Sequence, residues 1–228
     1  GQLLHRRGYR QATGKAPLRE TLAAAMLIGS GWDSTATLID PLCGSGTIPI
    51  EAALMARRIP PGMNRAFAFQ NWPSYESAEW ESLVGKSRDE ICPAGGLIAG
   101  SDRDAGAVDS ARANAERAGV SENVVLEVRA ISDVDFPVGN GSVVTNPPYG
   151  VRVGERGPLR NLYAQLGKTL RSQAPGYTIG LLSADTMLES ALDIPLAEVF
   201  RARNGGIPVR FLTGHLESGL GRREPETR

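Results

Sequence analysis

Cysteine and histidine are scarce in this chain of 228 residues, which holds two of each. The cysteines, Cys43 and Cys92, provide neither a disulfide framework nor the clustered ligand spacing of a zinc site. We therefore expect no metal site. Because disulfides mark oxidising compartments, the low cysteine content favours a reducing, cytoplasmic location.

Long hydrophobic runs are also missing. No apolar stretch approaches the ~18 residues that a membrane-spanning helix needs. The start, Gly1 to Arg7, lacks the apolar region of a signal peptide. Hydrophobic residues make up 41% of the chain and charged residues 22%, which is typical of an ordinary buried core. We expect one large domain with elaborations and no membrane partner.

Net charge is absent as well, since 25 basic residues balance 25 acidic ones. Nucleic-acid-binding proteins usually carry a basic footprint. Basic residues do gather at the N-terminus and late in the chain, at Arg6, Arg7, Arg10, Lys15, Arg19, Arg201, Arg203 and Arg210. Such clusters are usually solvated faces, so charge alone is no evidence for a nucleic-acid partner.

What the chain does contain is a regular alternation of short apolar runs and helical segments. This alternation predicts a seven-stranded α/β fold, with a mostly parallel sheet covered on both faces. Asn204-Gly205-Gly206 indicates a hairpin that adds one antiparallel strand. The expected strands are 36–39, 97–101, 124–128, 142–145, 177–182, 197–203 and 207–213. The expected helices are 17–28, 46–57, 104–118, 159–172 and 186–192, with an insertion near 59–96 that has one helix near 74–90.

A glycine-containing turn follows the first expected strand, in Asp40-Pro41-Leu42-Cys43-Gly44-Ser45-Gly46-Thr47. Glycine lets the backbone turn tightly and approach a ligand, and the next helix directs its N-terminus at the same place. A purely structural turn is the alternative. Pro49 breaks the Gly-x-Gly-x-x-Gly pattern of dinucleotide binding, which disfavours a nicotinamide. Cys43 has no histidine near it in sequence, and we interpret it as a small turn residue rather than a nucleophile.

Acidic residues follow the next two strands. Asp102 ends the second strand, where a carboxylate can accept hydrogen bonds from both hydroxyls of a ribose. Its alternative role is to cap the helix that begins near Ala105. Asp133, after the third strand, can accept a hydrogen bond from an adenine amine or be a plain loop residue. Both lie where ligands bind in open α/β sheets.

Asn146-Pro147-Pro148-Tyr149 directly follows the fourth strand. The side-chain oxygen of Asn146 and the carbonyl of Pro147 can accept both hydrogens of an exocyclic amine on a base, and proline keeps the second acceptor rigid. Tyr149 can stack on the base. An ordinary Pro-rich loop is the alternative. The position at the ligand edge favours methyl transfer from S-adenosylmethionine to an exocyclic nitrogen.

Several segments carry a family resemblance: 4–10, 16–25, 40–47, 50–53, 100–102, 110–115, 146–150 and 203–205. Together they resemble the catalytic domain of THUMP-associated RNA guanine-N2 methyltransferases, closest to the bacterial 23S rRNA enzymes. The resemblance implies a Rossmann-like methyltransferase fold, S-adenosylmethionine as donor and guanine in structured RNA as acceptor. Ribosomal RNA is the expected substrate, with transfer RNA as the alternative. The helix at Ala16-Pro17-Leu18 is expected over the methionine end of the cofactor.

The predicted site therefore has a catalytic and a cofactor-binding group. The catalytic residues are Asn146, Pro147 and Tyr149. The cofactor-binding residues are Pro17, Leu18, Asp40, Leu42, Cys43, Gly44, Ser45, Gly46, Thr47, Asp102, Arg103, Ser132, Asp133 and Asn146. Ala130 stands where some relatives carry an adenine-binding Asp, so Ser132, Asp133 or the backbone is expected to bind the adenine.

The expected organisation is an N-terminal arm at 1–16, the catalytic domain at 17–217 and a tail at 218–228. The resemblance implies a THUMP domain that should precede residue 1. Two other functions stay open: an adenine-N6 methyltransferase acting on nucleic acid, and an RNA-binding paralogue that has lost catalysis.

Overall fold

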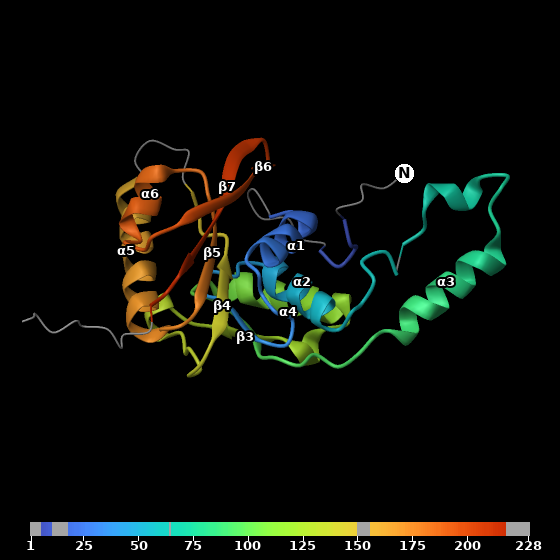
Figure 1. The fold of residues 1–228 in the computed structure, drawn as a ribbon, viewed down its shortest axis with the longest axis horizontal. Coiled ribbons are helices and arrows are strands. Elements are labelled where there is room, and N and C mark those ends of the chain that lie inside the picture. Colours follow the sequence, from blue (N-terminus) through green and yellow to red (C-terminus); the bar gives the residue numbers. More distant parts are fainter. Residues whose placement is uncertain (1–5, 11–17, 64, 150–155, 218–228) are drawn as a thin grey trace, which may run out of the picture.

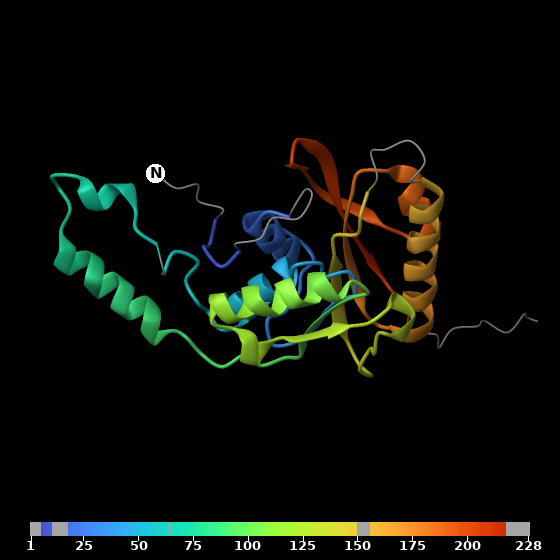
Figure 2. The same ribbon diagram turned by 180° about the vertical axis from the view of Figure 1, so that it is seen from behind.

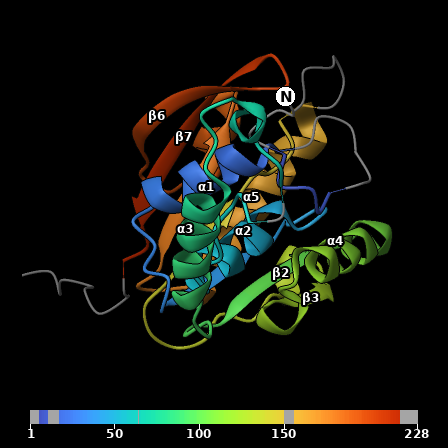
Figure 3. The same ribbon diagram turned by 90° about the vertical axis from the view of Figure 1, so that its right-hand side faces the viewer.

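The computed structural model describes residues 6–10, 18–63, 65–149 and 156–217. Seven strands form one sheet in the order β3-β2-β1-β4-β5-β7-β6. The strands are β1 (Thr37–Asp40), β2 (Ile98–Asp102), β3 (Val125–Val128), β4 (Gly141–Thr145), β5 (Thr178–Ser183), β6 (Ala197–Asn204) and β7 (Ile207–His215). Strand β7 runs antiparallel to both of its neighbours, β5 and β6, and the other strand pairs are parallel. Figure 3 shows β6 and β7 at one end of the sheet and β3 at the other.

Helices cover both faces of the sheet. The helices α1 (Glu20–Gly29), α2 (Thr47–Ala56) and α4 (Ala105–Ala118) lie on one face, and α5 (Arg156–Gln173) and α6 (Thr186–Ala191) lie on the other (Figure 1). Adjacent strand residues point to opposite faces. Leu38 and Val144 therefore join the core beneath α1, α2 and α4, while Ile39 and Val143 join the core beneath α5. The predicted doubly covered, seven-stranded sheet is confirmed.

The hairpin between β6 and β7 has the predicted geometry. Asn204 pairs with Ile207, and the two residues between them, Gly205 and Gly206, have φ of +56° and +87°. Positive φ at both central residues matches the twist of a two-residue hairpin turn, and glycine adopts it without steric cost. This tight turn fixes the position of Asn204 at the end of β6.

The insertion forms an arm that extends away from the sheet, as both Figure 1 and Figure 2 show. It contains η1 (Ala68–Asn71) and α3 (Ser77–Asp89), and α3 has no buried residue. Its aromatic rings pack on one another instead, with Phe69 and Trp80 centred 5.1 Å apart. The helix expected near 74–90 is confirmed, and the arm keeps its own small cluster separate from the two cores.

The described part of the N-terminal arm packs onto the domain. The Tyr9 hydroxyl donates to Glu51 Oε1 at 3.0 Å, and Arg7 lies 3.4 Å from the other oxygen of that carboxylate. Arg10 pairs with Glu20 in α1 at 3.0 Å. Burial raises the pKa of Glu51, and the contacts with Arg7 and Tyr9 counteract that rise. Residues expected in a linker therefore contribute to the core.

Several boundaries differ from those expected. Helix α5 begins at Arg156, so Pro158 lies inside its first turn rather than at its entrance. Proline fits there because the first amides of a helix have no intrahelical acceptor. Helix α1 begins at Glu20 after Arg19, and Pro17, expected in the first turn, lies outside the described residues. Two short 3-10 helices, η2 (Ser121–Asn123) and η3 (Ile131–Asp133), flank β3.

Candidate active site

The candidate site lies at the point in the sheet where the order of successive strands reverses. From β1 the chain proceeds to β2 and β3 on one side and returns to β4 on the other. In open α/β sheets, ligands bind at such a switch point, outside the carboxyl ends of the strands. The residues after β1, β2 and β4 therefore meet at one edge. These are the glycine turn, Asp102 and the Asn146-Pro147-Pro148-Tyr149 loop.

Asp40 connects the two central strands at this edge. Its Oδ1 accepts hydrogen bonds from the Thr145 hydroxyl at 2.7 Å and from the Leu42 amide at 3.2 Å. The residue is 1% exposed. Burial raises the pKa of Asp40 to about 7, although these hydrogen bonds counteract the rise; the Asp102 carboxylate adds to it. The end of β4, and hence the start of the Asn146 loop, is fixed to the end of β1.

The glycine turn requires glycine at one position for packing and leaves the other open. Gly44 and Gly46 have φ of +51° and +81°. A Cβ on Gly46 would lie 2.8 Å from the Cβ of Ala111 in α4, whereas no described atom lies within 4 Å of a Cβ on Gly44. Gly46 therefore permits α2 and α4 to pack closely. Gly44 faces space that a ligand can occupy.

Asp102 binds the glycine turn directly. Its Oδ2 accepts the Gly44 amide at 3.1 Å, and its Oδ1 accepts the Asp104 amide at 3.0 Å. The helix-capping role belongs to Asp104, whose side chain accepts the amides of Gly106 and Ala107. A carboxylate has about four acceptor positions, so Asp102 can still accept two hydroxyl donors. Asn114 supports the same turn by donating to the Ser45 carbonyl at 2.9 Å.

The loop after β4 presents an unpaired acceptor. Asn146 Oδ1 is buried and has no hydrogen-bond partner among the described residues. Pro147 beside it is buried. Buried polar atoms are nearly always hydrogen-bonded, so an orphaned amide oxygen at a ligand edge indicates that its donor comes from a ligand.

Tyr149 has a fixed environment. Its hydroxyl accepts a hydrogen bond from Asn204 Nδ2 at 2.8 Å, and its ring packs against the core beneath α1 and α2. Burial raises its pKa. Burial also raises the pKa of Tyr163 well above its ordinary value, and the nearby Tyr149 and Glu189 add to that effect. Tyr149 in the loop and Tyr163 near it are therefore both neutral tyrosines.

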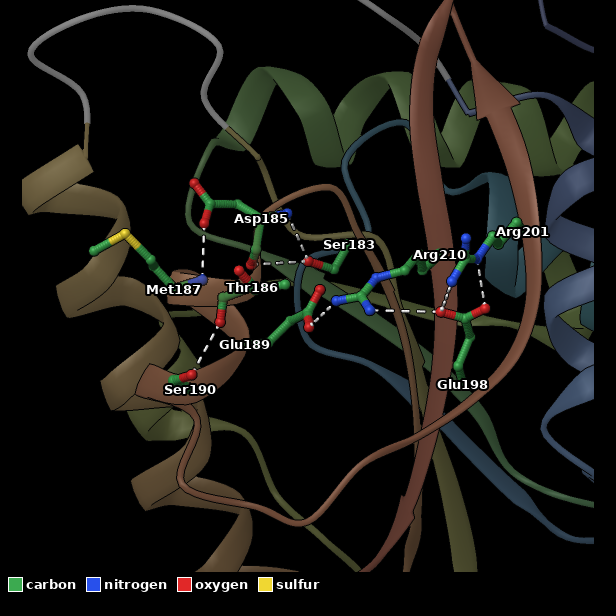
Figure 4. Close-up of polar contacts among 9 residues, drawn as sticks. All are labelled: Ser183, Asp185, Thr186, Met187, Glu189, Ser190, Glu198, Arg201 and Arg210. Atoms are coloured by element: carbon green, nitrogen blue, oxygen red, sulfur yellow. Dashed lines mark hydrogen bonds and ion pairs between the residues drawn. The ribbon is translucent and has the colours of Figure 1, made fainter.

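Ion pairs tie the hairpin to α6 beyond the end of β5 (Figure 4). Arg210 of β7 pairs with Glu189 of α6 and lies 3.5 Å from Glu198 of β6, which Arg201 contacts at 2.7 Å. Asp185 caps α6 by accepting the Met187 amide at 2.8 Å. These contacts join the β6–β7 hairpin to α6.

The remaining predicted residues differ in how closely they join the site. Leu42, Cys43 and Ser45 belong to the turn between β1 and α2, and Thr47 begins α2. Leu18 is buried ahead of α1. Pro17 lies outside the described residues. Arg103 is exposed, with no ion pair among the described residues. Ser132 and Asp133 are exposed in η3 and hydrogen-bond each other at 3.0 Å. No hydrogen bond within the described part of the chain joins them to the turn.

Cys43 has the environment of a structural residue. Its amide donates to the Ser101 carbonyl at 2.9 Å, and the side chain is buried. Burial raises the pKa of the thiol well above its ordinary value, with Asp40 and Asp102 adding to the rise. A thiol kept neutral in this way is a poor nucleophile, which agrees with the expected role as a small turn residue.

Three residues of the site were missing from the sequence prediction: Thr145, Asn114 and Asn204. Thr145 interrupts the apolar run at the end of β4, a signal that could have marked it. The sequence places Asn204 in a hairpin and Asn114 in a helix, and both lie in segments that carry the family resemblance, but it indicates no role in the site for either. Their contacts span 69 residues from Asn114 to Ser45 and 55 from Asn204 to Tyr149, so local pattern could not reveal them.

Neither a metal-binding cluster nor a membrane-spanning helix occurs among the described residues. Among the described residues, no group of three or more His, Cys, Asp or Glu side chains could hold a metal ion. None of the helices in those residues is long and apolar enough to cross a membrane.

Known proteins are similar to this chain in sequence and in fold. The chain is 40% identical over 235 residues to the ribosomal RNA large subunit methyltransferase K/L of Shewanella frigidimarina, covering 98% of this chain and 32% of that protein. It thus spans about a third of the length of the curated relatives it matches.

Solved structures agree with these relatives. A predicted N6-adenine-specific DNA methylase from Listeria monocytogenes is 31% identical with a TM-score of 0.80, covering 91% of this chain and 54% of that one. A putative methyltransferase, SMU.472, complexed with S-adenosylhomocysteine (SAH), is 30% identical with a TM-score of 0.82. The match covers 97% of this chain and 57% of that one.

The family described as "RMKL-like, methyltransferase domain" matches residues 7–212. This match includes all seven strands except the last residues of β7. The family resemblance is thereby confirmed: the chain belongs to the RMKL-like methyltransferase domain family.

Proposed function

We propose that this domain transfers a methyl group from S-adenosylmethionine to the exocyclic N2 of a guanine in structured RNA, with 23S ribosomal RNA as substrate. The observation that carries the proposal is the orphaned Oδ1 of Asn146 at the switch point. Membership of the family supports methyl transfer, and the curated relatives named ribosomal RNA methyltransferases support the acceptor.

The residues at the switch point fit the donor. Asp102 has free acceptor positions for ribose hydroxyls, and Gly44 leaves open space beside the turn. When bound, S-adenosylmethionine supplies an electrophilic methyl group on a sulfonium. The related putative methyltransferase was crystallised with SAH, which supports the same cofactor here. Ser132, Asp133 and Arg103 remain proposals for the adenine and ribose side.

The loop after β4 supplies the acceptor half of the reaction. The lone pair of a guanine amine is delocalised into the ring, so the amine is a weak nucleophile. Asn146 Oδ1 and the Pro147 carbonyl accept its two hydrogens and orient the nitrogen, and positioning of this kind contributes on the order of 7–11 kcal/mol at best. Tyr149 stacks on the base. No strong general base is needed, because the methylated amine is acidic and releases its proton readily.

An adenine-N6 acceptor is the second candidate, because it offers the same two amine hydrogens. One structural neighbour carries the name of a predicted N6-adenine-specific DNA methylase. A paralogue without catalysis is disfavoured, since Asp40, Asp102 and Asn146 are all in place. A THUMP domain elsewhere in the natural protein, transfer RNA as alternative substrate, the cytoplasmic location and the absence of a membrane partner remain predictions.

Nucleoside mass spectrometry tests the function in cells lacking the gene. Loss of N2-methylguanosine from one RNA supports the proposal and identifies that RNA. Loss of N6-methyladenine instead would keep the mechanism and overturn the substrate. If no methylated nucleoside is lost from RNA or DNA, the proposal is wrong.

Complementation then tests Asn146. Asn140 precedes β4 and is exposed, whereas Asn146 follows the same strand, so Asn140→Ala is the matched control. We expect Asn146→Ala to lower the rate of methyl transfer to RNA at least ~100-fold, whereas SAH binding persists. Wild-type activity in Asn146→Ala would contradict the mechanism.

A further inference from the structure

Asn204 is a buried polar residue whose hydrogen bonding leads to the candidate active site. It is 1% exposed, and its Nδ2 donates to the Tyr149 hydroxyl at 2.8 Å. Its Oδ1 is buried and has no partner among the described residues. Burying an amide is unfavourable unless it is hydrogen-bonded. Because half of this amide is unpaired, the side chain is poorly explained as a stabilising element.

We propose that Asn204 is a positioning residue for methyl transfer: it holds the Tyr149 hydroxyl and so fixes the ring on which the acceptor base stacks beside Asn146. The inference rests on the proposed function, because it needs a base on the Tyr149 ring. A tyrosine with a free hydroxyl can change its ring orientation, whereas a hydrogen bond at the ring's far end restricts that motion.

The β6–β7 hairpin that carries Asn204 is held by several contacts, as this role requires. The turn at Gly205 and Gly206 fixes the end of β6. Arg210 joins β7 to Glu189 of α6 and also reaches Glu198 of β6 (Figure 4). The Asn204 hydrogen bond therefore holds the loop after β4 from a hairpin at the edge of the sheet, and two strands, β5 and β7, lie between β4 and β6.

A second buried asparagine offers a matched comparison. Asn114 is also 1% exposed, and its Nδ2 donates to the Ser45 carbonyl at 2.9 Å. Asn114 supports the glycine turn on the cofactor side, whereas Asn204 supports Tyr149 on the acceptor side. The two alanine variants should therefore affect different substrates: Asn204→Ala the RNA, and Asn114→Ala the cofactor.

The experiment is a double-mutant cycle in the full-length protein that the gene encodes. Variants Asn204→Ala, Tyr149→Phe and the pair of both are assayed with labelled S-adenosylmethionine and RNA from cells lacking the gene. Total methyl incorporation gives kcat and KM for RNA, and calorimetry gives SAH affinity. Tyr149→Phe keeps the ring and removes only the hydroxyl.

We expect Asn204→Ala to lower kcat/KM for RNA roughly 10-fold in the wild-type background and less than about 2-fold in the Tyr149→Phe background. SAH affinity should stay unchanged, whereas Asn114→Ala should weaken it. Equal losses in both backgrounds, a parallel loss of SAH affinity in Asn204→Ala, or no loss at all would each overturn the inference.

The product nucleoside separates this outcome from the proposed function. Identification of the methylated nucleoside made by the wild-type protein tests the guanine assignment. The ratios among variants test Asn204 whichever exocyclic amine accepts the methyl group. If the wild-type protein transfers no methyl group, the proposed function and the inference that rests on it both fail.

Discussion

Replacing Gly46 should damage the fold, and the same change at Gly44 should damage ligand binding instead. Both residues have positive φ, a region that costs an L-residue roughly 1–2 kcal/mol. At Gly46 the added Cβ would also lie 2.8 Å from Ala111 Cβ, and overpacking of this kind costs about 1–3 kcal/mol. At Gly44 it would meet no described atom within 4 Å.

We therefore expect Gly46→Ala to lower the free energy of unfolding by about 2–5 kcal/mol. For a chain of this size, each kcal/mol shifts Tm by roughly 2–4 °C. Gly44→Ala should lower the free energy of unfolding by about 1–2 kcal/mol and weaken SAH binding, because its methyl group occupies the open space beside the turn. Urea unfolding and calorimetric titration with SAH measure the two effects.

A third variant isolates the packing contribution. Ala111→Gly, introduced into the Gly46→Ala protein, removes the methyl group that the new Cβ meets. Part of the lost stability should return, although glycine inside α4 costs up to about 1 kcal/mol of its own. The reasoning is refuted if Gly46→Ala unfolds like the wild type, or if Gly44→Ala is the less stable variant and binds SAH normally.

Three further predictions concern buried ionisable groups. Burial raises the pKa of Asp40 from near 3.8 to about 7, so the native state keeps a proton that the unfolded state loses. The free energy of unfolding should therefore fall from about pH 4 to pH 7 and then level off. Asp40→Asn should remove up to roughly 4 kcal/mol of that pH dependence. Identical pH profiles of the wild type and Asp40→Asn in urea unfolding would contradict this. Tyr9→Phe should destabilise by about 1–3 kcal/mol in urea unfolding, because buried Glu51 loses a donor; Glu51→Gln keeps an acceptor and should cost less. Iodoacetamide at pH 8 should modify Cys92 faster than buried Cys43, and mass spectrometry showing equal rates would refute that order.

The two segments of the candidate site and the residues that support them differ in how far local sequence revealed them. The glycine turn and the Asn146 loop are contiguous segments, each placed directly after an apolar strand, so their residue types and order sufficed to predict them. The supporting residues are different. Thr145 reaches Asp40 across 105 residues of sequence, and Asn204 reaches Tyr149 across 55. Such partners depend on strand order, which short-range periodicity does not encode.

The N-terminal arm illustrates the same limit. In the sequence, Arg6, Arg7 and Arg10 look like part of a solvated basic cluster. In the structure Tyr9 is 4% exposed, and two buried carboxylates, Glu20 and Glu51, bind the arm. Tyr9 and Glu51 are 42 residues apart in the chain, so no local pattern indicated their contact.

The sequence by itself determined the alternation of strands and helices, the positive-φ turn that favours glycine, and the position of the proline-rich segment directly after β4. Each of these follows from covalent geometry or local periodicity, which act over a few residues. Only the tertiary structure decided that β1 and β4 are neighbours, that Asp104 rather than Asp102 caps α4, and that a hairpin at the sheet edge holds Tyr149. These features depend on which surfaces meet when the cores on both faces of the sheet are buried, and that is a property of the whole chain.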